Sequence, residues 1–215
     1  MELELYVGTL TRYYAGDGQD SDDDLRLSVL MWRDSLSLAL EEHLEDPLDW
    51  DESAAAPRFT AELGWQGYGA LLLWAAYAEH PELPRPTTAT AEWESDPAYR
   101  ASVAVSHASR YGQLLYGPEL WLPCSFGFTF HAEDVWGDQV AIGSSVALLA
   151  ELQALNTATW HADAPTLAGW RRAGAPHGEA ALESWARYGL AVFFEQASRS
   201  VAHGLPMRLR YQSRL

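Results

Sequence analysis

The chain has 215 residues, a formal net charge of −16 and 48% hydrophobic residues. This length predicts one domain with a substantial core. All 14 cationic residues are arginines, so there is no lysine for a Schiff base, a pyridoxal phosphate linkage, a Walker A loop or the usual protein kinase site. The single cysteine, Cys124, excludes an internal disulfide and a cysteine-rich zinc cluster.

The sequence shows no targeting or membrane segment. The start, MELELYVGTL, lacks the basic region and apolar run of a signal peptide. The longest apolar segment, GALLLWAAYA at 69–78, is far shorter than the roughly twenty residues that span a bilayer. A lone cysteine is compatible with a reducing compartment. We therefore expect a soluble protein of the bacterial cytoplasm.

The first hundred residues begin with a strand and a helix. Alternation of apolar residues predicts a strand over 2–14. Aspartates at 22–24 then precede a segment, 25–44, with apolar residues at helical spacing, and acids in this position favour the start of a helix. The apolar stripe of this helix consists of Leu25, Val29, Trp32, Leu36 and Leu40.

A loop and a central helix come next. Residues 45–62 predict a loop because two prolines interrupt them, and 65–79 predict a helix that is apolar around most of its circumference. The connector 80–97 contains four prolines and is the best candidate for a boundary between lobes. Its last pair, Asp96–Pro97, is typical of a helix start, and 98–111 continues as helix or, over its SVAVS stretch, as strand.

The middle of the chain predicts strands leading into a helix. Residues 119–123 and 126–134 read as strands, and a turn at Gly137–Asp138 lies within 135–143, which returns as a third strand. A double serine at 144–145 then caps a helix over 146–160.

The last part of the chain predicts one long helix and a strand. Residues 161–178 read as irregular, 179–204 as a helix that stops at Gly204, and 205–212 as a final strand. Helices outnumber strands without strict alternation. The whole sequence therefore predicts an α+β fold, a single compact domain with a mainly antiparallel sheet packed with about four to five helices.

Charge is distributed unevenly along the chain. Residues 1–100 hold 21 acidic residues against six arginines, a net charge of −15, whereas 101–215 are nearly neutral. An acidic surface repels nucleic acid and anionic lipid and attracts cationic partners. The alternative interpretation is a solvated acidic face that promotes solubility.

Ten tryptophans in this length suggest an aromatic-rich core or an aromatic-lined groove, and some of them lie in acidic loops. Beside carboxylates, such rings are suited to anchor an arginine- or lysine-bearing partner through cation–π contacts. The alternative is that the rings are buried and fix the loops to the core. The predicted partner-binding residues are Asp49, Trp50, Asp51, Glu52, Trp93 and Glu94.

A second constellation suggests a small-ligand, metal-binding or catalytic site. Its residues are His107, Arg110, Tyr111, His131, Glu133 and Asp134. His131-Ala-Glu133 opens the zinc deaminase signature, but the second part, P-C-x-x-C, is missing after it. Cys124 would be a nucleophile with His107 or His131 as base, although a lone cysteine beside a phenylalanine-rich strand is more often buried.

The sequence favours a non-enzymatic function. Metalloprotease, P-loop and G-x-S-x-G hydrolase motifs are absent, and we expect no cofactor and no bound metal. Small acidic proteins that neutralise basic toxins or nucleases, the immunity proteins, have this kind of composition, which is a class-level analogy. The alternatives are the ligand or enzyme site just described and a structural subunit that forms a homo-oligomer.

Overall fold

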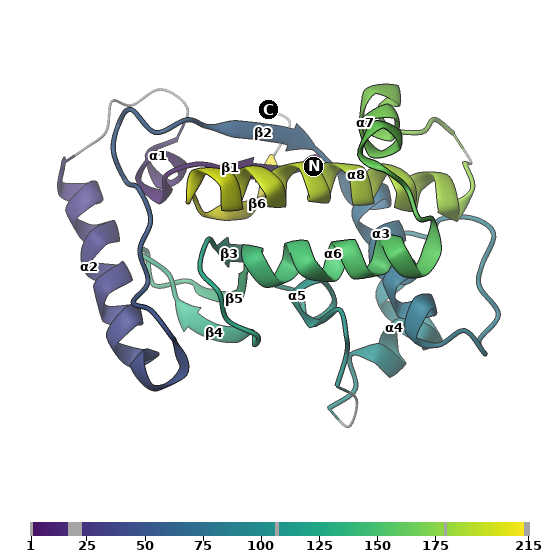
Figure 1. The fold of residues 1–215 in the computed structure, drawn as a ribbon, viewed down its shortest axis with the longest axis horizontal. Helices are drawn as coiled ribbons and strands as arrows, with labels where there is room; N and C mark the ends of the chain where they lie inside the picture. Colours follow the sequence, from purple (N-terminus) through teal and green to yellow (C-terminus); the bar gives the residue numbers. More distant parts are fainter. Residues whose placement is uncertain (1, 17–22, 106–107, 179, 213–215) are drawn as a thin grey trace.

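The computed structural model describes residues 2–16, 23–105, 108–178 and 180–212 (Figure 1). Within these ranges a mixed six-stranded sheet has the order β2-β1-β6-β3-β5-β4. The strands are β1 (Glu2–Val7), β2 (Phe59–Glu62), β3 (Leu120–Leu122), β4 (Phe130–Glu133), β5 (Gln139–Ser144) and β6 (Met207–Gln212).

The same ranges contain eight α-helices and two short 3-10 helices, so the α+β class is confirmed. The α-helices are α1 (Leu10–Ala15), α2 (Asp23–Ala39), α3 (Gly64–Glu79), α4 (Pro97–Ser102), α5 (Gly112–Leu115), α6 (Ser145–Thr159), α7 (Ala164–Ala173) and α8 (Leu182–His203). The 3-10 helices are η1 (Glu41–His43) and η2 (Trp93–Ser95).

The sheet is mixed because one pair, β3 and β5, runs parallel. After β3 the chain passes to the edge as β4 and returns as β5, which inserts between β3 and β4. β5 pairs with β3 in the same direction and with β4 in the opposite direction. The other neighbouring strands are antiparallel. The expected mainly antiparallel sheet is therefore confirmed, with four antiparallel pairs and one parallel pair among the described strands. Local patterns predict the strands but not the insertion of β5.

Apolar residues pack on both faces of the sheet. One cluster joins alternate residues of β1 and β6, such as Leu5 and Leu209, to α3, α6 and α8. The other joins Leu120 and Ile142 to α1, α2 and the segment around Trp50. Figure 1 shows α2 at one end of the molecule and α4 at the other. The side of α2 that faces away from the second cluster is therefore exposed.

The approach of α3 to α8 is close enough to require glycine. A Cβ atom added to Gly189 would lie 2.4 Å from the carbonyl oxygen of Gly67. A Cβ on Gly67 would already press on the ring of Tyr188 at 3.2 Å. The two backbones therefore touch at this crossing, at the centre of the first cluster.

Several element boundaries differ from the sequence expectations. The strand predicted over 2–14 ends at Val7, and α1 follows because Thr9 caps its first turn by accepting a hydrogen bond from the backbone N–H of Arg12. The predicted loop 45–62 ends in the edge strand β2. The helix expected over 98–111 stops at Ser102, where α4 ends.

The number of helices was underestimated because short ones were missed. The segment 161–178, expected to be irregular, contains α7, which begins at the cap Asp163 and ends before Gly174, a glycine with a φ of 77°. Both signals are present in the sequence. The starts at Asp96 and Ser144 and the stop at Gly204 are confirmed.

We predict that Gly189→Ala destabilises the protein by about 1–3 kcal/mol, because the new methyl group overpacks the crossing of α3 and α8. Gly169→Ala on α7 is the matched control, since its Cβ would meet no atom within 4 Å. That variant is expected to raise stability by up to about 1 kcal/mol through helix propensity. Urea denaturation of both variants measures the difference, and equal effects would contradict the close approach.

Candidate functional site

A buried carboxylate fixes the loop that follows α2. Glu52 is 4% exposed and accepts hydrogen bonds from the backbone N–H groups of Leu10 and Thr11, both at 2.9 Å. It also accepts from the hydroxyl of Thr11 at 2.7 Å and from the indole N–H of Trp50 at 2.7 Å. Glu52 thus caps α1 and holds Trp50 in the second apolar cluster.

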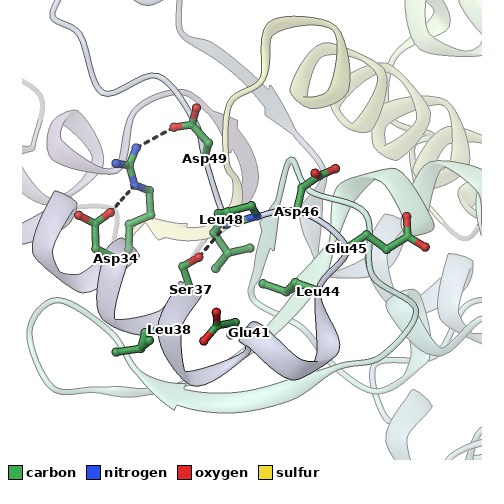
Figure 2. Close-up of a pocket in the computed structure, with 11 residues that line it drawn as sticks. Asp34, Ser37, Leu38, Glu41, Leu44, Glu45, Asp46, Leu48 and Asp49 are labelled. Atoms are coloured by element: carbon green, nitrogen blue, oxygen red, sulfur yellow. Dashed lines mark hydrogen bonds and ion pairs between the residues drawn. The ribbon is translucent and has the colours of Figure 1, made fainter.

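The segment held by Glu52 forms one wall of a groove, and α2 with η1 forms the other (Figure 2). Hydrogen bonds tie the two walls together. The Ser37 hydroxyl accepts from the backbone N–H of Leu48 at 2.9 Å. Arg33 donates to the Asp49 carboxylate at 3.0 Å and to the backbone carbonyl of Trp50 at 3.2 Å. The groove is therefore a fixed feature of the fold.

The groove is strongly acidic and has a volume of about 770 Å³. We call it the acidic groove. Its described lining contains five carboxylates against one arginine, together with apolar and small side chains. The lining residues are Arg33, Asp34, Ser37, Leu38, Glu41, Leu44, Glu45, Asp46, Pro47, Leu48 and Asp49.

The arginine cancels only part of this charge. Arg33 pairs with Asp34 at 3.1 Å and with Asp49 at 3.0 Å, and both carboxylates remain largely in water. Glu41, Glu45 and Asp46 are exposed on the groove walls. The acidic groove therefore presents an excess of negative charge around a partly apolar lining.

The predicted partner-binding residues fall in different environments. Asp49 lines the acidic groove, and Asp51 is exposed beside it, where its carboxylate accepts from the backbone N–H of Ser53 at 2.7 Å. Trp50 and Glu52 are buried, at 5% and 4% exposure. Trp50 thus matches the alternative interpretation, in which a ring fixes a loop to the core.

Trp93 also matches that alternative. It is 8% exposed and packs edge-on against Tyr68 and Tyr99, with its ring above the Cα of Gly69. Its neighbour Glu94 is exposed. Both belong to η2, which packs on α3 and α4, whereas the acidic groove lies along α2. The two predicted acidic loops therefore do not form one surface.

The alternative constellation is divided by the structure. Asp134 is 5% exposed and accepts hydrogen bonds from the Tyr14 hydroxyl at 2.8 Å and from Arg208 at 3.1 Å. It also accepts from the backbone N–H groups of Trp136 and Asp138. Burial pushes the pKa of Asp134 upward, but these hydrogen bonds outweigh it and hold the pKa below its usual value. Asp134 thus belongs to a buried ionic cluster that joins β4, β6 and α1.

His131 and Glu133 share the exposed face of β4, as the alternation of the strand predicts. Arg110 is exposed and Tyr111 is buried before α5. His107 lies outside the described residues. In the part of the chain that the structure describes, no three His, Cys, Asp or Glu side chains are placed to hold a metal ion.

Cys124 is half-buried, and its thiol contacts the backbone carbonyl of Asp49 at 3.6 Å. Burial raises the pKa of the thiol, which disfavours the nucleophilic thiolate. This environment fits the interpretation of Cys124 as a packed residue.

A buried carboxyl group lies close to the start of α5. The Oε1 atom of Glu151 accepts from the backbone N–H of Gln113 at 3.1 Å, while its Oε2 is buried with no hydrogen-bond partner among the described residues. Burial raises the pKa of Glu151 to about 8. Nearby, Glu79 accepts from the Ser109 hydroxyl and the backbone N–H of Arg110.

Two smaller hollows adjoin each other beside α8, with Ala175 and Tyr188 in both linings. One has a volume of about 500 Å³ and includes Trp65 and Trp185, and the other has about 320 Å³ and includes Trp170. They correspond to the aromatic-lined groove suggested by composition. The first hollow contains two carboxylates, those of Glu2 and Glu62, against five in the acidic groove, and the described lining of the second contains Arg187 and no carboxylate.

The sequence interpretation missed most of the acidic groove. Asp34, Glu41, Glu45 and Asp46 belong to it, but the sequence places them only within a helix over 25–44 and a loop over 45–62, and does not mark them as binding residues. The signal that points to them is the run EEHLED at 41–46, which follows an amphipathic helix directly. Only the fold shows that the chain turns back here and brings Asp49 opposite Asp34.

Comparison of the chain with protein-family models, with curated proteins and with solved structures gives no match. Among the described residues, none of the helices combines the length and the apolar character needed to cross a membrane. The function is therefore argued from the acidic groove itself.

We predict that Asp134→Asn lowers the stability at pH 7 by about 3–5 kcal/mol, because it leaves Arg208 buried without its ionic partner. Since the pKa of Asp134 is lower in the folded state, the ionised carboxylate stabilises the protein above the unfolded pKa of about 4. This stabilisation is lost as the pH falls through the folded pKa, so the deficit of the variant shrinks in acid.

Urea denaturation between pH 3 and 7 measures this effect. Glu133→Gln, at the exposed neighbouring position, is the control and is expected to change stability by less than about 0.5 kcal/mol. A deficit of Asp134→Asn that stays constant with pH would contradict the assignment.

We predict the opposite pH dependence for Glu151→Gln. Between the unfolded pKa of about 4.3 and the folded pKa of about 8, the folded protein keeps a proton that the unfolded chain has released. Wild-type stability therefore falls as the pH rises through this window. The variant does not titrate at this position, so its stability relative to the wild type rises by about 1.4 kcal/mol per pH unit within this window. Urea denaturation at pH 5, 7 and 8.5, with Glu94→Gln as control, tests this, and parallel profiles would refute it.

Proposed function

We propose that this chain is a non-enzymatic acidic binding protein that occludes a basic macromolecular partner, in the manner of an immunity protein. The acidic groove is the observation that carries the proposal. It gathers carboxylates of α2, η1 and the segment up to Asp49 around one hollow, and the net charge of the whole chain has the same sign.

The acidic groove suits arginine or lysine side chains of a protein better than a small anion. The carboxylates of Glu45 and Asp46 attract the cationic head of such a side chain, while Leu38 and Leu44 contact its aliphatic stem. The walls are preorganised by Arg33 and Ser37, so little conformational entropy is lost on binding.

Charge also determines which partners are disfavoured. Nucleic acid and anionic lipid surfaces carry the same sign as this chain and are repelled. A basic protein gains long-range attraction, which accelerates encounter and depends on ionic strength. Binding over the acidic groove would inactivate the partner by covering its basic surface, with no catalytic group required.

We predict that the triple variant Glu41→Gln, Glu45→Gln, Asp46→Asn slows association with the basic partner by about tenfold at low salt and changes dissociation much less. The partner is captured from native lysate at low salt, released at high salt and purified. Stopped-flow kinetics with the purified partner then give both rate constants.

A second triple variant controls for net charge. Glu82→Gln, Glu92→Gln and Glu94→Gln remove the same charge from exposed positions outside the acidic groove. If the groove is the binding surface, this variant associates at nearly the wild-type rate. If both variants slow association equally, the effect comes from net charge alone. If only the second variant slows association, the partner binds near the loop at 92–94 and not at the acidic groove.

A further inference from the structure

Helix α2 carries a second apolar stripe that the core does not use. Leu27, Met31 and Leu38 are 56%, 62% and 73% exposed. They lie on the side of the helix opposite Val29 and Leu36, which are buried in the second apolar cluster. Exposed apolar residues that line up on one helix face and have polar borders mark an interaction surface. We call this set of three residues the exposed stripe.

The spacing of the exposed stripe is that of a two-helix seam. Leu27 and position 34 are seven residues apart, as are Met31 and Leu38, and the intervals of four and three residues alternate between them. This is the repeat by which helices pack along each other through two positions of each heptad. The remaining seam position holds Asp34, and continuing the repeat toward the start of α2 gives Asp24; both residues are exposed.

The seam and the acidic groove form one surface. Asp34 and Leu38 belong to both, so the exposed stripe runs along the edge of the acidic groove. Figure 2 labels both side chains among those that line the groove. A ligand that packs on the exposed stripe would therefore meet the carboxylate of Asp34 within the seam and the other carboxylates of the acidic groove along one side.

We propose that α2 is the docking helix for an amphipathic basic helix of the partner, which packs on the exposed stripe and places its cationic residues against Asp34 and the acidic groove. This inference rests on the proposed function and specifies the partner's binding element. From Leu27 to Leu38 the seam is about 16 Å long at 1.5 Å per residue, so roughly three turns of the partner helix are enough.

Asp34 selects the chemistry of the partner helix. An acidic group in a seam is left desolvated and unpaired when it faces leucine, but it pairs well with arginine or lysine. Its present bond to Arg33 is no obstacle, because its side chain is 70% exposed and an exposed ion pair contributes little stability. A cationic residue at the facing position would thus set the register of the two helices.

Charge argues against two other occupants. A second copy of the chain would bring like-charged acidic grooves together along the same seam, at a net charge of −16 for each copy. An anionic lipid surface would meet the same repulsion. A basic helix satisfies the apolar stripe and the carboxylates at once.

The test uses two synthetic peptides of about three heptads with the same composition. The helix peptide has leucines along one face, one arginine in the central layer of that face and arginines on its flanks. The scrambled peptide distributes the same residues so that no helix face is apolar. Fluorescence anisotropy gives the affinity of each labelled peptide for the full chain at rising salt concentrations.

We expect the helix peptide to bind about tenfold or more tightly than the scrambled peptide. The double variant Leu27→Ser, Met31→Ser should bring the helix peptide down to the affinity of the scrambled one and leave the scrambled peptide unchanged. Val201→Ser, at an exposed apolar position on α8, is the control. Asp34→Asn should weaken binding of the helix peptide but not of an analogue with leucine in place of its central arginine.

Failure of the inference differs from failure of the proposed function. If both peptides bind with equal, salt-sensitive affinity and the double variant has no effect, the acidic groove stands and the docking helix is refuted. If neither peptide binds, both proposals fall. A concentration-dependent dimer in light scattering that Leu27→Ser, Met31→Ser abolishes would assign the exposed stripe to a second copy and overturn the inference.

Discussion

The shape of the acidic groove depends on one buried carboxylate. A carboxylate is costly to bury unless strong hydrogen bonds replace its water, and Glu52 receives them from the start of α1 and from Trp50. This arrangement joins parts of the chain about forty residues apart. It fixes the segment before it, so that Leu48 and Asp49 stand opposite α2. Glu52 therefore shapes the acidic groove by holding one wall in place, although its own charge is buried.

Helix α2 serves two purposes because its two faces are both partly apolar. One face closes the second cluster, where Trp32 also donates from its indole N–H to the carbonyl of Glu133 at 2.7 Å. The other face exposes Leu27, Met31 and Leu38 to water. The surrounding carboxylates compensate for this exposure, since net charge of one sign opposes self-association. The same carboxylates therefore maintain solubility and favour a partner of opposite charge.

The sequence predicts those elements whose signals are local. The cap at Ser144, the start at Asp96 and the stop at Gly204 are each set by a residue and its immediate neighbours, and all three are confirmed. The end of β1 is only partly local. Thr9 caps α1 from within the turn, but the carboxylate that accepts from the first N–H groups of α1 comes from the distant Glu52. The position of β5 beside β3 likewise depends on pairing across the sheet.

The negative charge of the candidate site could be predicted from the sequence, but the residues that form it could not. The acidic excess of the first hundred residues is visible in the sequence, whereas the burial of Trp50 and Trp93 depends on distant partners. The sequence around an acid-flanked tryptophan is the same whether its ring is exposed for a partner or buried in the core, and only the fold distinguishes the two. The exposed stripe was hidden for a related reason: periodicity identifies apolar faces, and only packing shows which of two faces the core covers.

Charge and apolar contact would contribute to different stages of binding at this surface. Attraction by the carboxylates extends over about 10 Å at moderate salt and so acts before contact, where it governs the rate of encounter. The exposed stripe acts only at contact, where burying Leu27, Met31 and Leu38 lengthens the lifetime of the complex. Asp34 belongs to both stages, because it lies in the seam between Met31 and Leu38 and carries a charge. A partner that is merely basic would therefore bind fast and leave fast, whereas a basic amphipathic helix would remain.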